Sequence, residues 1–163
     1  MLDNIPYFPY ILSAFIGIGL AAASGFRVFL PMFAVSLASY MGWIPMNDHF
    51  MWLAGLPTLI TTGIATIVEV LAYYIPYVDH LLDTISVPLA TVAGSVLFAS
   101  QFADLGTFPT WALALIAGGG TAAAISSGFA GTRAASTATT GGLGNSVVAT
   151  TETAGAGIMT FLA

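Results

Sequence analysis

The sequence predicts an all-helical fold, a polytopic transmembrane bundle of about six membrane helices. Its 163 residues are 58% hydrophobic and only 6% charged, and their mean hydropathy is +0.95. Most gaps between neighbouring charged residues approximate one membrane crossing. Soluble domains are usually about one quarter charged, so these residues cannot cover a water-facing surface. We therefore expect residues 1–163 to form a single transmembrane domain with the lipid bilayer as its main partner.

Six apolar segments are long enough for this arrangement, because a span needs roughly 20 apolar residues to cross about 30 Å of hydrocarbon. Charged residues and prolines mark their ends. The segments run from Pro9 to Phe26, Val28 to Ile44, Met51 to Ile75, Ile85 to Ala103, Pro109 to Ala130 and Asn145 to Leu162.

Prolines and aromatic residues support these boundaries. Pro31 lies near the start of the second segment, where a helix tolerates proline. Pro76 follows the third segment and cannot continue its helix. Aromatic belts are typical of membrane interfaces. Eight aromatic residues lie close to the proposed ends: Tyr7, Tyr10, Tyr40, Trp43, Trp52, Tyr73, Tyr74 and Tyr77.

The chain between the fifth and sixth segments is unusually polar. Thr, Ser and Gly dominate residues 132–153, and such a segment gains little by facing lipid. Polar backbone survives at membrane depth only against protein or a water-filled cavity. We therefore expect residues 131–146 to form a re-entrant or interrupted segment inside the bundle. A surface loop is the alternative.

The few charges also predict an orientation. With six alternating helices, Arg27, the 76–84 connection and Arg133 lie on one side of the membrane. The other side receives Asp3, Asp48, His49 and Asp104. Cytoplasmic loops favour Lys and Arg, so the arginine side is expected in the cytoplasm and both termini outside. An arginine buried for function would carry no such signal.

Four charged residues are expected to meet inside the bundle. Glu69 lies about six residues before the end of its segment and Glu152 about seven after the start of its own, so both lie roughly 10 Å below the arginine side. A charge at this depth costs at least about 2.5 kcal/mol, and such residues face the interior and tend to pair. We expect Arg27, Glu69, Arg133 and Glu152 to form one ionic cluster.

Two interpretations of this cluster remain open. In the functional one, Arg27 and Arg133 offer planar donors to an anionic solute or headgroup, while Glu69 and Glu152 hold the arginines or exchange protons. In the structural one, the four residues are a neutralised network that fixes the helix register. The adjacent polar, glycine-rich segment favours the functional interpretation.

Further polar residues flank the cluster. Asn145 could line the same site with its amide, or it could cap the last helix. Asp79, His80 and Asp83 could supply part of a divalent metal site, but the further ligands would have to come from elsewhere. A solvated connection is the favoured interpretation, so no metal site is predicted.

Several functions are excluded or disfavoured. The chain has no cysteine, which excludes disulfides, Cys-based zinc sites and thiol catalysis. Two basic residues are too few for a nucleic-acid interface. The chain lacks lysine and common hydrolase motifs, so we expect it not to be an enzyme and to need no cofactor.

Small residues recur at helical spacing and predict close helix packing in lipid. Whether these stripes pack within one chain or between subunits stays open. They are Gly17, Ala21 and Gly25; Gly120, Ala124 and Gly128; and Ala149, Thr153 and Gly157.

The stretch Leu20-Ala-Ala-Ala-Ser-Gly-Phe-Arg-Val-Phe-Leu-Pro31 resembles the signature of a family of small bacterial integral-membrane proteins of unknown function, DUF4126-like. Further matches are Glu69 with Tyr74-Ile-Pro-Tyr-Val-Asp79, and Thr132-Arg133 followed by Asn145 and Glu152. The resemblance implies a compact helical domain of the bacterial inner membrane, sometimes linked to transport. Family members often carry a basic residue where this chain has Tyr73 or Tyr74, and a proline at Ser146. The missing charge leaves Asp79 without an obvious local partner.

Two functions follow as hypotheses. The first is a membrane protein that transports or binds a small polar or anionic solute through Arg27, Glu69, Arg133, Asn145 and Glu152, with Asp79 nearby; so short a chain is expected to act as a homo-oligomer or in a larger assembly. The second is an accessory subunit of a larger membrane complex, in which the ionic cluster only holds shape.

Overall fold

The computed structural model describes residues 7–102 and 105–163, without the side chains of residues 76, 77 and 80. Asp3, Asp104 and the side chains of Tyr77 and His80, named above, lie outside these described parts. The helices are α1 (Phe8–Phe26), α2 (Phe29–Tyr40), the 3-10 helix η2 (Asp48–Ala54), α3 (Leu56–Ala72), α4 (Pro76–Ala99), α5 (Thr107–Leu113), the π-helical segment η3 (Ala114–Gly119), α6 (Gly120–Thr140) and α7 (Asn145–Leu162).

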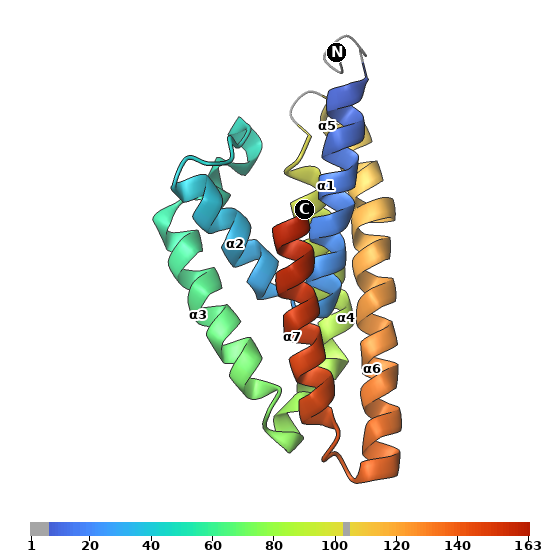
Figure 1. Cartoon of the computed structure of the whole chain (residues 1–163). Coiled ribbons are helices and arrows are strands. Elements are labelled where there is room, and N and C mark those ends of the chain that lie inside the picture. Colours follow the sequence, from blue (N-terminus) through green and yellow to red (C-terminus); the bar gives the residue numbers. More distant parts are fainter. Residues whose placement is uncertain (1–6, 103–104) are drawn as a thin grey trace.

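The helices form a bundle with a separate arm (Figure 1). Helix α1 lies at the centre and packs on α4, α6 and α7. Helices α2 and α3 pack on each other and lean away from the rest of the bundle (Figure 1). The α1–α2 break therefore lies where the arm joins the bundle, and Arg27 occupies it.

Among the described residues, three helices are long and apolar enough to cross a membrane: Phe8–Phe26, Leu81–Ala99 and the continuous run Thr107–Thr140. A bent pair, η2 with α3, would make a fourth, and its two parts meet at 56°. Large apolar side chains cover the outer surface, including Phe161 at 90% exposure and Ile116 at 77%. This surface is compatible with an integral membrane protein, and the predicted count of about six spans is not confirmed.

Small residues allow the central helices to approach closely. A Cβ added at Gly17 would lie 2.8 Å from the ring of Phe98 in α4, and one at Gly25 would lie 2.8 Å from the carbonyl oxygen of Ala122 in α6. The Gly17, Ala21, Gly25 stripe is therefore a packing seam within the chain. By contrast, Gly120, Ala124 and Gly128 lie on the exposed face of α6.

The prediction for residues 131–146 is wrong over most of its length. Helix α6 continues to Thr140, and only residues 141–144 form a turn. Threonine hydroxyls donate to carbonyls four residues earlier in this helix, as Thr132 does to Gly128 and Thr140 to Ser136. Polar side chains are thus satisfied without unwinding the backbone. The helix ends at Gly141, where φ is +63°.

Three other parts of the prediction also differ from the structure. Pro76 does not open a loop over residues 76–84 but begins α4, because a proline lacks only a donor that the first helical turn does not use. The second segment ends early, with α2 spanning only 12 residues. The third is divided at Gly55 into η2 and α3.

Candidate functional site

A buried ionic network joins three helices and the α1–α2 break. Glu152 of α7 accepts a hydrogen bond from Nη2 of Arg133 in α6, and the same Oε2 lies 3.4 Å from Nη2 of Arg27. Nη1 of Arg133 donates to Asp83 of α4. Arg27, Arg133 and Glu152 are at most 2% exposed. One carboxylate is therefore shared by two buried guanidinium groups.

Arg27 reaches this network because the chain leaves the helical conformation directly after α1. Its backbone is extended, with φ −144° and ψ 124°. Its Nε donates to the hydroxyl of Thr153 at 3.1 Å, and its Nη2 donates to the carbonyl oxygen of Ala149 at 2.8 Å. Two consecutive turns of α7 thus fix the direction of the guanidinium group.

The Tyr73 ring lies against both guanidinium groups. Cζ of Arg27 is 4.1 Å from the ring centroid, and Cζ of Arg133 is 3.9 Å from it. Tyr73 follows the last residue of α3 and is itself buried. A cation over an aromatic face is stabilised electrostatically, most strongly when water is excluded. Tyr73 therefore links the arm to the ionic network.

Glu69 does not form an ion pair with either arginine within 4.0 Å, in contrast to the predicted four-residue cluster. Its Oε1 accepts the backbone N–H of Val28 at 2.8 Å, and its Oε2 accepts that of Phe29 at 3.0 Å. These N–H groups belong to the start of α2, where a helix leaves donors without intrahelical partners. The carboxylate caps α2 from α3.

Asp79 and Asn145 form a second buried polar group near the α6–α7 turn. Nδ2 of Asn145 donates to Oδ2 of Asp79 at 2.9 Å and to the hydroxyl of Thr137 at 3.0 Å. Asn145 is the first residue of α7, and no side-chain cap is formed there. The capping interpretation of Asn145 is therefore wrong, because its amide is engaged with α4 and α6.

Several buried polar atoms have no hydrogen-bond partner among the described residues. In the ionic network they are Nη1 of Arg27 and Nε of Arg133, and in the second group they are Oδ1 of Asp79 and Oδ1 of Asn145. Leaving a buried donor or acceptor without a partner costs about 1–3 kcal/mol, and more for a charged group. The two arginines thus keep donors available, whereas Asp79 and Asn145 keep acceptors available.

The space at the ionic network is small. Arg133, Glu152, Glu69 and Tyr73 line a cavity of about 10 Å³. A volume of this size holds about one water molecule. An apolar groove of about 140 Å³ lies beside it, between the arm and α4, and also reaches Glu69 and Tyr73. The network is therefore closed to larger solutes in this conformation.

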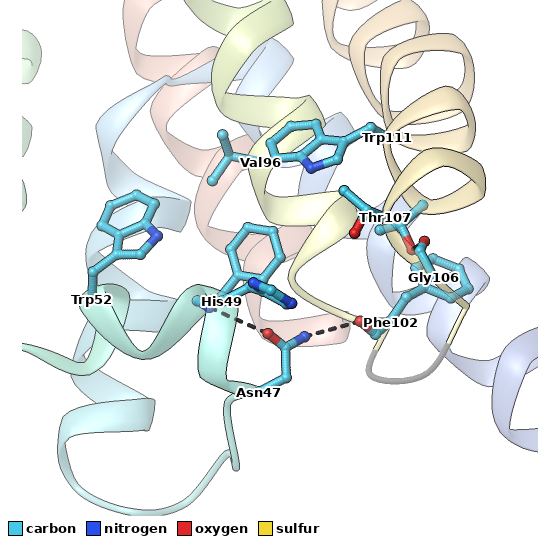
Figure 2. A pocket seen from close by; sticks show the side chains of 10 residues that line it. Asn47, His49, Trp52, Val96, Phe102, Gly106, Thr107 and Trp111 are labelled. Carbon is cyan, nitrogen blue, oxygen red and sulfur yellow. Dashed lines mark hydrogen bonds between the residues drawn. The ribbon is translucent and has the colours of Figure 1, made fainter.

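A larger cavity lies near η2, the end of α4 and the start of α5 (Figure 2), and shares no lining residue with the cavity at the ionic network. It measures about 330 Å³ and is lined by aromatic residues that include Trp52 and Trp111. Asn47 fixes one wall, because it donates to the carbonyl oxygen of Phe102 at 2.9 Å and accepts the N–H of Phe50 at 3.2 Å. The side-chain amide of Asn47 thus joins the start of η2 to the segment that follows α4.

The structure brings together Arg27, Arg133 and Glu152 of the predicted residues and places Asp79 with Asn145. Sequence reasoning did not assign Asp83, Tyr73 or Thr153 to the site. Asp83 lies four residues after Asp79 and hence on the same side of α4, which is a usable signal. Tyr73 was interpreted as an interfacial aromatic, and its sequence neighbourhood contains no sign of its contacts. Within the parts of the chain that the structure describes, no group of three or more His, Cys, Asp or Glu residues could hold a metal ion.

Most of the chain matches a known protein family. The family model described as Domain of unknown function (DUF4126) matches residues 14–163. No curated protein and no solved structure matches the chain. The matched range includes every residue of the ionic network and of the Asp79–Asn145 group.

Proposed function

The chain belongs to the family DUF4126, a domain of unknown function, and we propose that it is an integral membrane protein that binds or transports a small polar or anionic solute at Arg27 and Arg133. The observation that carries this proposal is a pair of buried guanidinium groups, each with a nitrogen that has no acceptor in the described parts of the chain. Planar guanidinium donors suit carboxylates and other oxyanions.

The solute would replace the Glu152 carboxylate. In the closed network Glu152 contacts both arginines, so it occupies the position that an external anion needs. A solute anion that enters must displace this internal carboxylate, or Glu152 must take up a proton. Charge balance in the low-dielectric interior is kept when Glu152 takes up a proton as the solute anion binds, because displacement of an ionised carboxylate would leave one negative charge unpaired.

The route to the network would run past Asp83. The side chain of Asp83 is 17% exposed, whereas those of Arg27, Arg133 and Glu152 are at most 3% exposed. Arg133 lies seven residues before the end of α6, so the network is about 10 Å from that end of the helix. Separation of Asp83 from Arg133 would open the shortest path from this end.

A salt series tests the proposal. The purified protein is unfolded thermally in detergent with chloride, nitrate, acetate or phosphate, all as N-methyl-D-glucamine salts at one ionic strength. We expect saturable stabilisation by at least one of these anions, stronger in Glu152→Gln because the competing charge is gone. Arg133→Gln should remain folded and lose the effect. Equal responses of all three proteins to every salt would exclude the site.

A second candidate, an accessory subunit of a membrane complex, is favoured by the outer face of α6. A Cβ added at Gly120, Gly128 or Gly131 would meet no atom within 4 Å, so this small-residue face is free to pack on another helix. Purification in a mild detergent discriminates the candidates. Co-migrating polypeptides support the accessory role, whereas a self-contained oligomer with an anion response supports transport or binding.

A further inference from the structure

The Asp79–Asn145 group has an excess of acceptors. Asp79 is 1% exposed and Asn145 is 5% exposed, and one hydrogen bond joins them. This bond uses Oδ2 of Asp79 and Nδ2 of Asn145. The remaining oxygen of each side chain, Oδ1 in both, has no partner among the described residues. Two neighbouring buried residues thus each present an unused oxygen.

The missing partner should be positively charged. No Arg side chain of the described chain lies within 4.0 Å of Asp79, since Arg27 and Arg133 pair with Glu152 and Asp83. Asp79 lies in the first turn of α4, a position where acidic side chains are common. Buried charges in proteins are normally paired. The Asp79 carboxyl group has one amide as its donor and therefore lacks a charged partner among the described residues.

A cavity adjoins both residues. It measures about 210 Å³ and is lined by Asp79, Asn145, Tyr74 and the turn residues Gly141 and Gly142, among others. Gly141 and Gly142 both have positive φ, at +63° and +91°. The turn between α6 and α7 thus brings irregular backbone to the cavity that Asp79 and Asn145 also line, and backbone carbonyls in such broken segments are typical cation ligands in membrane proteins.

We propose that Asp79 and Asn145 bind a small monovalent cation through their Oδ1 atoms. One carboxylate and neutral oxygens balance a single positive charge, whereas divalent ions such as Ca²⁺ take 6–8 oxygen ligands that include several carboxylates. The group uses none of the charged residues of the Arg27–Arg133 network. Failure of either proposal therefore leaves the other intact.

Direct binding is the primary test. The full-length protein in detergent is titrated with ²²Na⁺ in a scintillation proximity assay, with N-methyl-D-glucamine chloride holding ionic strength and anion constant. We expect saturable binding of one ion per chain. Competition by K⁺, Li⁺ and NH₄⁺ then identifies the preferred cation. Absence of saturable binding, together with absence of stabilisation by any of these cations, overturns the proposal and indicates a trapped water.

Matched variants assign the site. Asp79→Asn supplies an N–H donor to the free oxygen of Asn145, so it should remain folded and bind the cation at least about tenfold more weakly. Asp48→Asn removes an exposed carboxylate in η2, at the other end of the bundle (Figure 1), and should leave binding unchanged. Equal affinity of Asp79→Asn and the parent protein would contradict the assignment.

A second variant keeps the test decisive if Asp79→Asn does not fold. Asn145→Asp places a second carboxylate beside Asp79, and the two charges repel unless a cation lies between them. We expect its thermal stability to depend more steeply on cation concentration than that of the parent protein, with Ca²⁺ becoming effective. A stability independent of every cation would contradict the proposal.

Discussion

Oε1 of Glu69 accepts the backbone N–H of Val28 at 2.8 Å, across 41 positions of the chain. Its second oxygen accepts the next amide, that of Phe29. A buried carboxylate is thereby paired with the N-terminus of a helix, where the orphan donors and the helix dipole both favour negative charge. Glu69 fixes the α2–α3 arm at the point where the arm leaves the bundle.

Replacement of Glu69 should therefore destabilise the arm. Glu69→Ala leaves two buried amides without acceptors, at about 1–3 kcal/mol each, whereas Glu69→Gln keeps one acceptor and should lose less. Unfolding in SDS measures the loss, and hydrogen exchange should quicken at Val28 and Phe29 in particular. Val68→Ala, on the exposed side of the same helix, is the control. Equal losses in Glu69→Ala and the control would contradict the cap.

Tyr73 is expected to contribute mainly through its ring, whose face contacts both guanidinium groups. Tyr73→Phe keeps both contacts with the guanidinium groups, while Tyr73→Leu removes them at roughly 0.5–2 kcal/mol for each desolvated contact. We expect SDS unfolding to show a small effect for the first variant and a clearly larger one for the second. If both variants behave alike, the contacts with Arg27 and Arg133 carry no net stability.

The sequence predicts that charged residues converge inside the bundle. It does not predict which groups each of them contacts. Burial cost alone indicates that Arg27, Arg133 and Glu152 meet, because an apolar chain has nowhere else to place them. The partner of Glu69 could not be found in this way. Its carboxylate oxygens accept backbone N–H groups, which every residue except proline possesses. No sequence pattern therefore distinguishes Val28 and Phe29 from other candidates.

The helices themselves were predictable to different degrees. Helix α1 follows its predicted segment because an uninterrupted apolar run has a single favourable state in lipid. The prediction for residues 131–140 was wrong because Ser and Thr, which are abundant there, are poor helix formers in water. In the folded chain their hydroxyls bond to the preceding turn, as Thr139 does to the carbonyl oxygen of Ala135, and the helix persists.

Close packing of α4 on η3 leads to a prediction with a matched control. A Cβ added at Gly118 would lie 2.6 Å from Cβ of Phe98 and 2.7 Å from the carbonyl oxygen of Gly94. Gly118→Ala should thus destabilise the protein by about 1–3 kcal/mol through overpacking. Gly120 has no atom within 4 Å of such a Cβ, so Gly120→Ala should be neutral or stabilise the helix. Thermal unfolding in detergent compares the two variants, and equal melting temperatures would contradict the packing.

Orientation in the membrane is the last expected outcome, and the absence of cysteine makes it simple to measure. Leu143 lies in the α6–α7 turn and is 85% exposed, near the end of the bundle that holds Arg133. His49 is exposed in η2 at the other end (Figure 1). Because cytoplasmic loops favour arginine, a membrane-impermeant maleimide should label His49→Cys in intact cells.

Leu143→Cys should react only in inside-out vesicles. The reverse labelling pattern would show the opposite orientation. Burial of Arg27 and Arg133 would account for that result, because charges that are neutralised inside the protein hold the surrounding loops on one side of the membrane only weakly. Labelling of both positions from the same side is a different result. It would contradict a bundle that spans the membrane with η2 and the α6–α7 turn at opposite surfaces.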